Sequence, residues 1–179
     1  MFGLALVAHE FIIVTIGTKW EPSVILLQLL CIGGAFIPLQ TLYQNLIISR
    51  GRSDSYLRLV ALQIVLQIVL TLSLASLGIT AMVAAFSALN VLFTACWHYA
   101  LQRIHPLPAL DVLKDTMPFA LIAAVVMLAT HYATLSITSL WLLLLTRIIV
   151  AAALYFMVMR LLNVTILKEC LQFIRKKKA

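Results

Sequence analysis

The chain alternates between long apolar runs and short polar breaks, of which the first lies at residues 17–22 and the second, charged one at 50–54. A helix needs about 20 apolar residues to cross a hydrocarbon core of about 30 Å, and most of the runs reach that length. We therefore predict an all-α fold, a polytopic integral membrane helix bundle. The predicted spans, about six in number, cover residues 2–17, 23–49, 56–77, 80–101, 116–135 and 140–162, in a transmembrane region at 1–162 followed by a basic tail at 163–179.

The runs are predicted to be helical because lipid offers no hydrogen-bond partners to the backbone, so only helices and closed barrels can span it. The period-two alternation of barrel strands is absent from them. As a helix, the run at 23–49 would be roughly 40 Å long, longer than the core, and Pro38 predicts a kink in it. A short interfacial helix is predicted at 110–114, ahead of the span that begins near Thr116.

Composition excludes a water-soluble fold. Hydrophobic residues make up 64% of the chain and charged residues 11%, whereas soluble domains contain about 45–50% apolar and about 25% charged residues. The net charge of +7 does not indicate nucleic-acid binding, because the basic residues lie between and after the apolar runs rather than in a patch with exposed aromatic residues. The expected surroundings are membrane lipid, with no nucleic-acid partner.

The distribution of basic residues predicts an orientation, because short cytoplasmic loops collect lysine and arginine. The breaks after the second and fourth spans are basic, and so is the tail, whereas the alternate breaks hold only Lys19. With an even number of spans, both termini are therefore predicted to be cytoplasmic. The basic residues at the predicted cytoplasmic mouth between the second and third spans are Arg50, Arg52 and Arg58.

No catalytic constellation is present. Cys31 and Cys96 fall in apolar runs and Cys170 in the tail, without the spacing of a metal site or a disulfide framework. Zinc-protease, phosphate-loop and paired-carboxylate motifs are also missing. We expect no metal, no cofactor and no enzymatic activity, since a lipid-linked sugar transferase would rest only on Asp111 and Asp115.

Polar residues recur at helical spacing inside several spans, which places them on single helix faces. One interpretation is that they hold helices together, each hydrogen bond contributing about 0.6–2 kcal/mol. The other is that they line a cavity for a hydrophilic headgroup. The stripes are Gln40, Gln44 and Asn45 in the second span, Gln63, Gln67 and Thr71 in the third, and Ser87, Asn90, Thr94 and His98 in the fourth. The substrate-cavity candidates among them are Gln40, Gln44, Asn45, Gln63, Gln67, Asn90 and Thr94.

Two charged residues lie well inside predicted spans, whereas Arg58 and Arg160 lie near the ends of theirs. Arg147 is a further candidate for the cavity, where it would bind an anionic group, although pairing with a neighbour or reaching toward the nearer surface explains it equally simply. Glu10, beside His9, is a possible coupling carboxylate for protons, or a residue near water. We expect His98 and His131 to lie at the membrane–water interface. The glycosylation sequon at Asn163 is expected to be coincidental.

Several short motifs occur in a characteristic order. They are Gly17-Thr18-Lys19-Trp20, Leu26-Leu27-Gln28-Leu29-Leu30, Arg50-Gly51-Arg52-Ser53-Asp54 followed by Arg58, Gly78-Ile79, and Asp115-Thr116-Met117-Pro118. In order and spacing, over nearly the full length, the chain resembles bacterial polysaccharide flippases of the multidrug/oligosaccharidyl-lipid/polysaccharide exporter superfamily, which is MATE-like.

The resemblance implies a fold of about fourteen helices in two inverted lobes, of which this chain looks like the last six, with an N-terminal half as its missing partner. It also implies a multi-pass protein of the bacterial inner membrane and a polyprenyl-pyrophosphate-linked oligosaccharide as substrate, for capsule, exopolysaccharide or O-antigen synthesis. Alternating access needs two repeats that move against each other, so we expect the chain alone not to translocate substrate. The alternatives are a multidrug or other lipid exporter of the same superfamily and a non-transporting membrane scaffold subunit.

Overall fold

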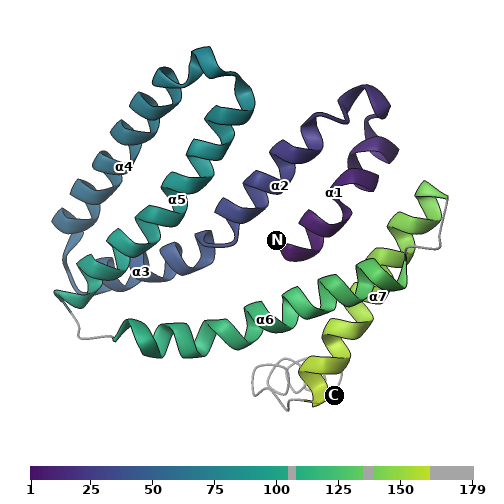
Figure 1. Cartoon of the computed structure of the whole chain (residues 1–179). Helices are drawn as coiled ribbons and strands as arrows, with labels where there is room; N and C mark the ends of the chain where they lie inside the picture. The colour runs from purple at the N-terminus through teal and green to yellow at the C-terminus, as the bar shows by residue number, and fades with distance from the viewer. Residues whose placement is uncertain (105–107, 135–138, 162–179) are drawn as a thin grey trace, which may run out of the picture. The chain divides into compact units, whose positions relative to one another are not determined.

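The computed structural model describes residues 1–104, 108–134 and 139–161, and these residues form helices without any strand (Figure 1). The basic tail predicted at 163–179, with Cys170 and Asn163, lies outside them. The all-α prediction is confirmed for the described part of the chain. The elements are α1 (Phe2–Thr15), η1 (Thr18–Trp20), α2 (Ser23–Gly34), α3 (Ile37–Ser49), α4 (Ser53–Ser73), η2 (Ala75–Leu77), α5 (Ile79–Gln102), α6 (Ala109–Ala133) and α7 (Leu140–Leu161).

Five helical stretches among the described residues are long and apolar enough to cross a membrane. The chain is therefore a multi-pass membrane protein by helix length and composition. The first predicted span is the exception, because α1 has only 14 residues, roughly 21 Å at the rise of an α-helix. The five stretches are Ser23–Ser49, Ser53–Ser73, Ile79–Gln102, Ala109–Ala133 and Leu140–Arg160.

The second predicted span is interrupted, as its proline suggests, but just before that proline. Helix α2 ends at Gly34 and α3 begins at Ile37, with Pro38 in the first turn of α3. Proline lacks the amide that would bond to the carbonyl four residues earlier, and it is well tolerated at the start of a helix. The chain therefore starts a new helix at Ile37 with Pro38 in its first turn, and Figure 1 shows α2 and α3 running in different directions.

Helix α6 corrects the boundary predicted near Thr116. The residues expected to form a separate interfacial helix, 110–114, and the following span are one continuous helix with Pro118 inside it. Proline in a membrane helix costs one backbone hydrogen bond, which neighbouring groups and local adjustments offset. The side chain of Thr116 donates to the carbonyl of Val112 in this turn, at 2.7 Å.

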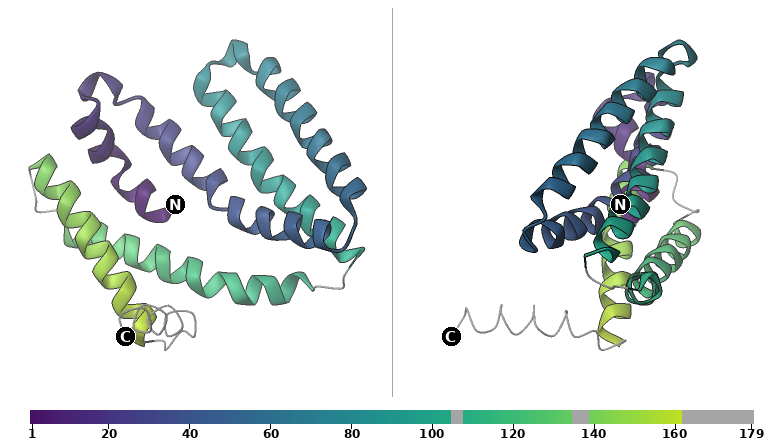
Figure 2. Two further views of the ribbon diagram at one scale, coloured as in Figure 1. Left: turned by 180° about the vertical axis from the view of Figure 1, so that it is seen from behind. Right: turned by 90° about the vertical axis from the view of Figure 1, so that its left-hand side faces the viewer.

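The chain divides into two compact units, Met1–Met117 and Pro118–Ala179. In the first, α1 and α2 form one hairpin and α4 and α5 another, as the left view in Figure 2 shows. Gly17 and Gly78 stand at the two hairpin turns with φ of 103° and 92°, a region that side chains with a Cβ rarely adopt. The predicted turn at Gly78 is confirmed.

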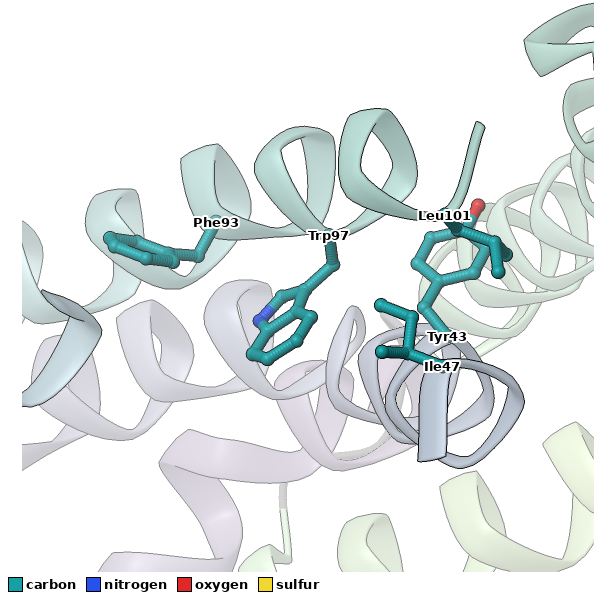
Figure 3. Packing of buried hydrophobic residues seen from close by; sticks show 5 residues of the cluster. All are labelled: Tyr43, Ile47, Phe93, Trp97 and Leu101. Carbon is teal, nitrogen blue, oxygen red and sulfur yellow. The ribbon is translucent and has the colours of Figure 1, made fainter. Parts of the chain in front are cut away.

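The apolar core of the first unit joins α3 to α5. Trp97 is fully buried, and Figure 3 shows it between Phe93 and Leu101 along α5, with two side chains of α3, Tyr43 and Ile47, facing this row. Helix α4 packs against α5 but has no buried residue, so most of its surface is left for lipid. Polar side chains can therefore meet on the inner faces of α3, α4 and α5, where these helices pack against one another.

Candidate functional site

Gln40 connects α3 to α5. Its side chain is 5% exposed, and its amide nitrogen donates to the backbone carbonyl of Asn90 at 2.5 Å and to Oγ1 of Thr94 at 2.9 Å. Both acceptors are one turn apart on α5, and Thr94 itself donates to the Asn90 carbonyl at 3.1 Å. Gln40 and Thr94 therefore act as a hydrogen-bonded link between two helices.

Gln63 extends this network to α4. Its amide nitrogen donates to Oδ1 of Asn90 at 3.4 Å, and its Oε1 accepts from the indole of Trp97 at 3.3 Å. The Asn90 amide also donates to the carbonyl of Phe86, 3.1 Å away in its own helix. Three helices thus meet at Asn90, whose polar groups are satisfied within the apolar interior.

An open groove of about 390 Å³ lies beside this network, and four amide side chains line it. Gln44 contributes from α3, Gln63 and Gln67 from α4, and Asn90 from α5; the other lining residues are aromatic or aliphatic. The amide nitrogen of Gln67 is buried and has no hydrogen-bond partner among the described residues. Four of the eight predicted cavity candidates therefore do line one groove.

The stripes thus separate into different roles. Gln40 and Thr94 belong to the helix-linking network and do not line the groove. Gln44 and Gln67 line the groove, and their side chains make no hydrogen bond to another described residue. Asn45, which follows Gln44 in the chain, is exposed and belongs to neither. Helix linking therefore describes Gln40 and Thr94, whereas a headgroup cavity lined by Gln44 and Gln67 stays a prediction.

Two more residues of the fourth-span stripe lie elsewhere on α5. Ser87 faces Gly33 of α2 at the closest approach of the two helices, and His98 is 3.2 Å from the hydroxyl of Tyr43 and 2.9 Å from the amide of Gln102. His98 is therefore a hydrogen-bonded residue near the end of its helix, and its expected position at the membrane interface stays a prediction.

A second cavity, open to the surface and about 700 Å³ in volume, lies between the start of α4 and the end of α5, and three arginines line it. Arg52 and Arg58 were singled out from the sequence, but the structure does not include Arg50 in the lining and adds Arg103. Because α4 and α5 form a hairpin, the first turns of one lie beside the last turns of the other. The predicted hairpin places the start of one helix beside the end of the next, and this was the signal in the sequence that would have indicated Arg103.

Glu10 lies on α1 and is 5% exposed. Its Oε1 is 3.8 Å from Nδ1 of His9, whose Nε2 is 3.8 Å from a carboxylate oxygen of the exposed Glu21. The histidine therefore lies between two carboxylates near the α1–α2 turn. A role for Glu10 in proton coupling stays a prediction.

Arg147 belongs to the second unit, where it is 7% exposed. Its Nε donates to Oγ1 of Thr134 at 3.1 Å, and its Nη2 is 3.3 Å from Nδ1 of His131. Pairing with neighbouring side chains, one of the interpretations drawn from the sequence, therefore describes its contacts. Its role as a cavity residue stays a prediction.

In the part of the chain that the structure describes, no group of three metal-ligating side chains occurs. Cys31 is buried and Cys96 exposed, and both are free thiols. No protein-family model matches the chain, and no curated protein or solved structure matches it. The resemblance to polysaccharide flippases therefore rests on the motifs of the sequence.

Proposed function

We propose that this chain is part of a transporter that moves a polyprenyl-pyrophosphate-linked oligosaccharide across a bacterial inner membrane. The observation that carries the proposal is the groove where four amides meet on helices of membrane-spanning length. A carboxamide both donates and accepts hydrogen bonds, as sugar hydroxyls do. Polar side chains inside a membrane are costly and tend to face a cavity or another helix, so a groove that gathers four of them suits a hydrophilic headgroup.

Gln67 supports this proposal most directly. A buried polar group without a partner costs about 1–3 kcal/mol, and the Gln67 amide nitrogen carries that cost in the described structure. The nitrogen itself is buried, so a ligand hydroxyl would accept this hydrogen bond after the Gln67 side chain rotates toward the groove that it lines. The groove is thus polar where an apolar lining would be more stable, which favours a binding role over a purely structural one.

The lining of the groove also helps to distinguish a polysaccharide exporter from a multidrug exporter. Sites for drug-sized molecules are lined mainly by hydrophobic and aromatic side chains, with a few placed polar groups. Here five of the nine lining residues are aromatic or aliphatic, and the other four are amides that come from all three surrounding helices. Four amides in one groove are more than a few placed polar groups, which favours a hydroxyl-rich headgroup over an apolar drug.

A non-transporting scaffold subunit is the second candidate, and the bonds from Gln40 to α5 favour it. They show that at least part of the polar stripe holds helices together. The two candidates differ in what they predict for the groove residues, because a scaffold has no use for an unpartnered amide at Gln67.

The test compares Gln67→Leu with Gln40→Leu in the full chain, purified in detergent. Binding of a fluorescent polyprenyl-pyrophosphate oligosaccharide and the free energy of unfolding are both measured. Gln67→Leu removes one hydrogen bond to the ligand, so we expect about three- to tenfold weaker binding and unchanged or higher stability. Gln40→Leu removes two interhelical bonds, so we expect a loss of about 1–3 kcal/mol in stability and unchanged binding by the folded fraction.

Two outcomes would count against the transporter proposal or against the groove as its site. If the unaltered chain binds no lipid-linked oligosaccharide while Gln40→Leu destabilises it, the scaffold candidate is supported and the transporter proposal fails. If Gln67→Leu binds the ligand as tightly as the unaltered chain, the groove is not the headgroup site.

A further inference from the structure

We infer that the cavity between α4 and α5 is a phosphate-binding site, formed by the three arginines Arg52, Arg58 and Arg103. Arginine presents a planar fork of donors that matches phosphate oxygens in pairs. No carboxylate is among the residues that line the cavity. Asp54, in the first turn of α4, is close in sequence but is not part of this lining.

The guanidinium groups of Arg52 and Arg58 are available to a ligand. Within residues 1–104, 108–134 and 139–161, neither side chain makes a hydrogen bond or an ion pair. A cluster of like charges without counter-charges is unfavourable, and a bound anion would relieve the repulsion. The cavity is therefore electrostatically suited to a group with more than one negative charge.

Arg103 is held in place by its neighbour on α5. Its guanidinium carbon lies 4.8 Å from the centre of the Tyr99 ring, and its Nη2 donates to the Tyr99 hydroxyl at 2.5 Å. A fixed guanidinium loses less conformational freedom when a ligand binds. Tyr99 thus acts as a positioning residue for the arginine that faces α4.

The start of α4 adds to the site. Arg52 is the N-cap of this 21-residue helix, no side chain caps it, and Ser55 in the first turn lines the cavity. The backbone amide of Ser55 donates to the carbonyl of Arg52 at 3.1 Å, so the helix contributes the positive end of its dipole, which attracts anions and which Asp54 in the same turn partly offsets. Backbone and side chains therefore favour the same kind of ligand in the same place.

The source of the phosphate follows from what surrounds the charges. Leu59 and Ile104 also line the cavity, and the hairpin that carries it consists of two helices of membrane-spanning length. An anion that carries an apolar chain would satisfy both features. That this molecule is the pyrophosphate-bearing carrier lipid rests on the proposed function, whereas the phosphate chemistry does not.

Cys96 provides the assay, because this exposed thiol lines the same cavity while Cys31 is buried. In a Cys170→Ser background these are the two remaining cysteines. The rate at which a membrane-permeable maleimide modifies Cys96 is measured by mass spectrometry in detergent micelles. The probes are a polyprenyl diphosphate without sugar, phosphatidylglycerol, inorganic pyrophosphate, and a polyprenol as the uncharged control.

We expect the polyprenyl diphosphate to slow modification of Cys96 about fivefold or more at saturation, and the polyprenol to have no effect. Arg52→Gln, Arg58→Gln and Arg103→Gln each remove one charge-assisted contact and should weaken this protection about tenfold or more in ligand concentration. Arg50→Gln is the matched control, with the same charge change in the same loop but outside the cavity. It should leave the protection unchanged.

Phosphatidylglycerol or inorganic pyrophosphate could instead protect Cys96, with the same dependence on the three arginines. This result would uphold the phosphate site. It would also identify a source of phosphate other than the carrier lipid and count against the proposed function. Failure of every phosphate probe to protect Cys96 overturns the site itself. An equal effect of Arg50→Gln also overturns it, since diffuse positive charge would then be sufficient.

Discussion

Gly33→Ala tests how closely α2 and α5 pack. A methyl group at Gly33 would lie 2.9 Å from Cα of Ser87 and 3.1 Å from its Cβ and Oγ. Carbon atoms in contact are normally about 3.5–4.0 Å apart, so the helices would have to separate by roughly 0.6 Å or more. Because the nearest atom belongs to the backbone, no rotamer change relieves the clash. Overpacking of this kind costs about 1–3 kcal/mol.

The matched control is Gly34→Ala, the same change at the next residue of α2. Its new methyl would meet the flexible end of Met1, with Cε at 3.1 Å and Sδ at 3.4 Å, and that side chain can move away. Both variants gain a similar amount of helix propensity, at most about 1 kcal/mol. The difference between them therefore isolates the clash with α5.

We expect Gly33→Ala to be less stable than Gly34→Ala by about 1–3 kcal/mol. The measurement is the free energy of unfolding of the purified chain, from titration of mixed micelles with sodium dodecyl sulfate and detection by circular dichroism. Equal stabilities within about 0.5 kcal/mol would refute the reasoning, because the close approach of the two helices would then carry no energetic constraint.

Three further predictions use the same titration. Trp97→Ala, in the fully buried core, should cost about 3–5 kcal/mol, whereas Trp20→Ala at a half-exposed position should change little; similar losses would contradict the core assignment. Thr134→Val removes the acceptor for Arg147 and should cost about 0.6–2 kcal/mol, more than Thr116→Val, whose hydroxyl bonds only within its own helix. Pro118→Ala restores a backbone donor inside α6 and should stabilise the chain by up to about 3 kcal/mol; a destabilised variant would show that the proline itself is required for packing.

Much of the fold could be predicted because membrane helices leave a strong signal. A run of about 20 apolar residues has few alternatives to a helix once the backbone must satisfy its own hydrogen bonds. The turn at Gly78 and the interruption near Pro38 were also predictable from local backbone chemistry. The continuation of α6 through Pro118 was not, because the cost of one missing hydrogen bond depends on what surrounds the helix.

Many residues of the candidate site were predictable from the sequence, but Arg103 and the role of each residue were not. Gln40 and Gln44 lie four residues apart on the same stripe, and nothing in their spacing distinguishes a buried link to α5 from a residue lining an open groove. Likewise, Arg50 and Arg52 share one loop, yet only Arg52 lines the arginine cavity. Such differences depend on which helix lies opposite each side chain.

The sequence by itself determined that the chain is helical, apolar and built to cross a membrane several times, because span length and composition are local properties of the chain. Only the tertiary structure decided which polar side chains meet one another and which meet a cavity. It joined Gln40 to Asn90, left the Gln67 amide nitrogen without a partner and brought Arg103 to the cavity of Arg52. The physical reason is that a helix face specifies a direction, whereas a contact requires a second helix at a defined distance and register.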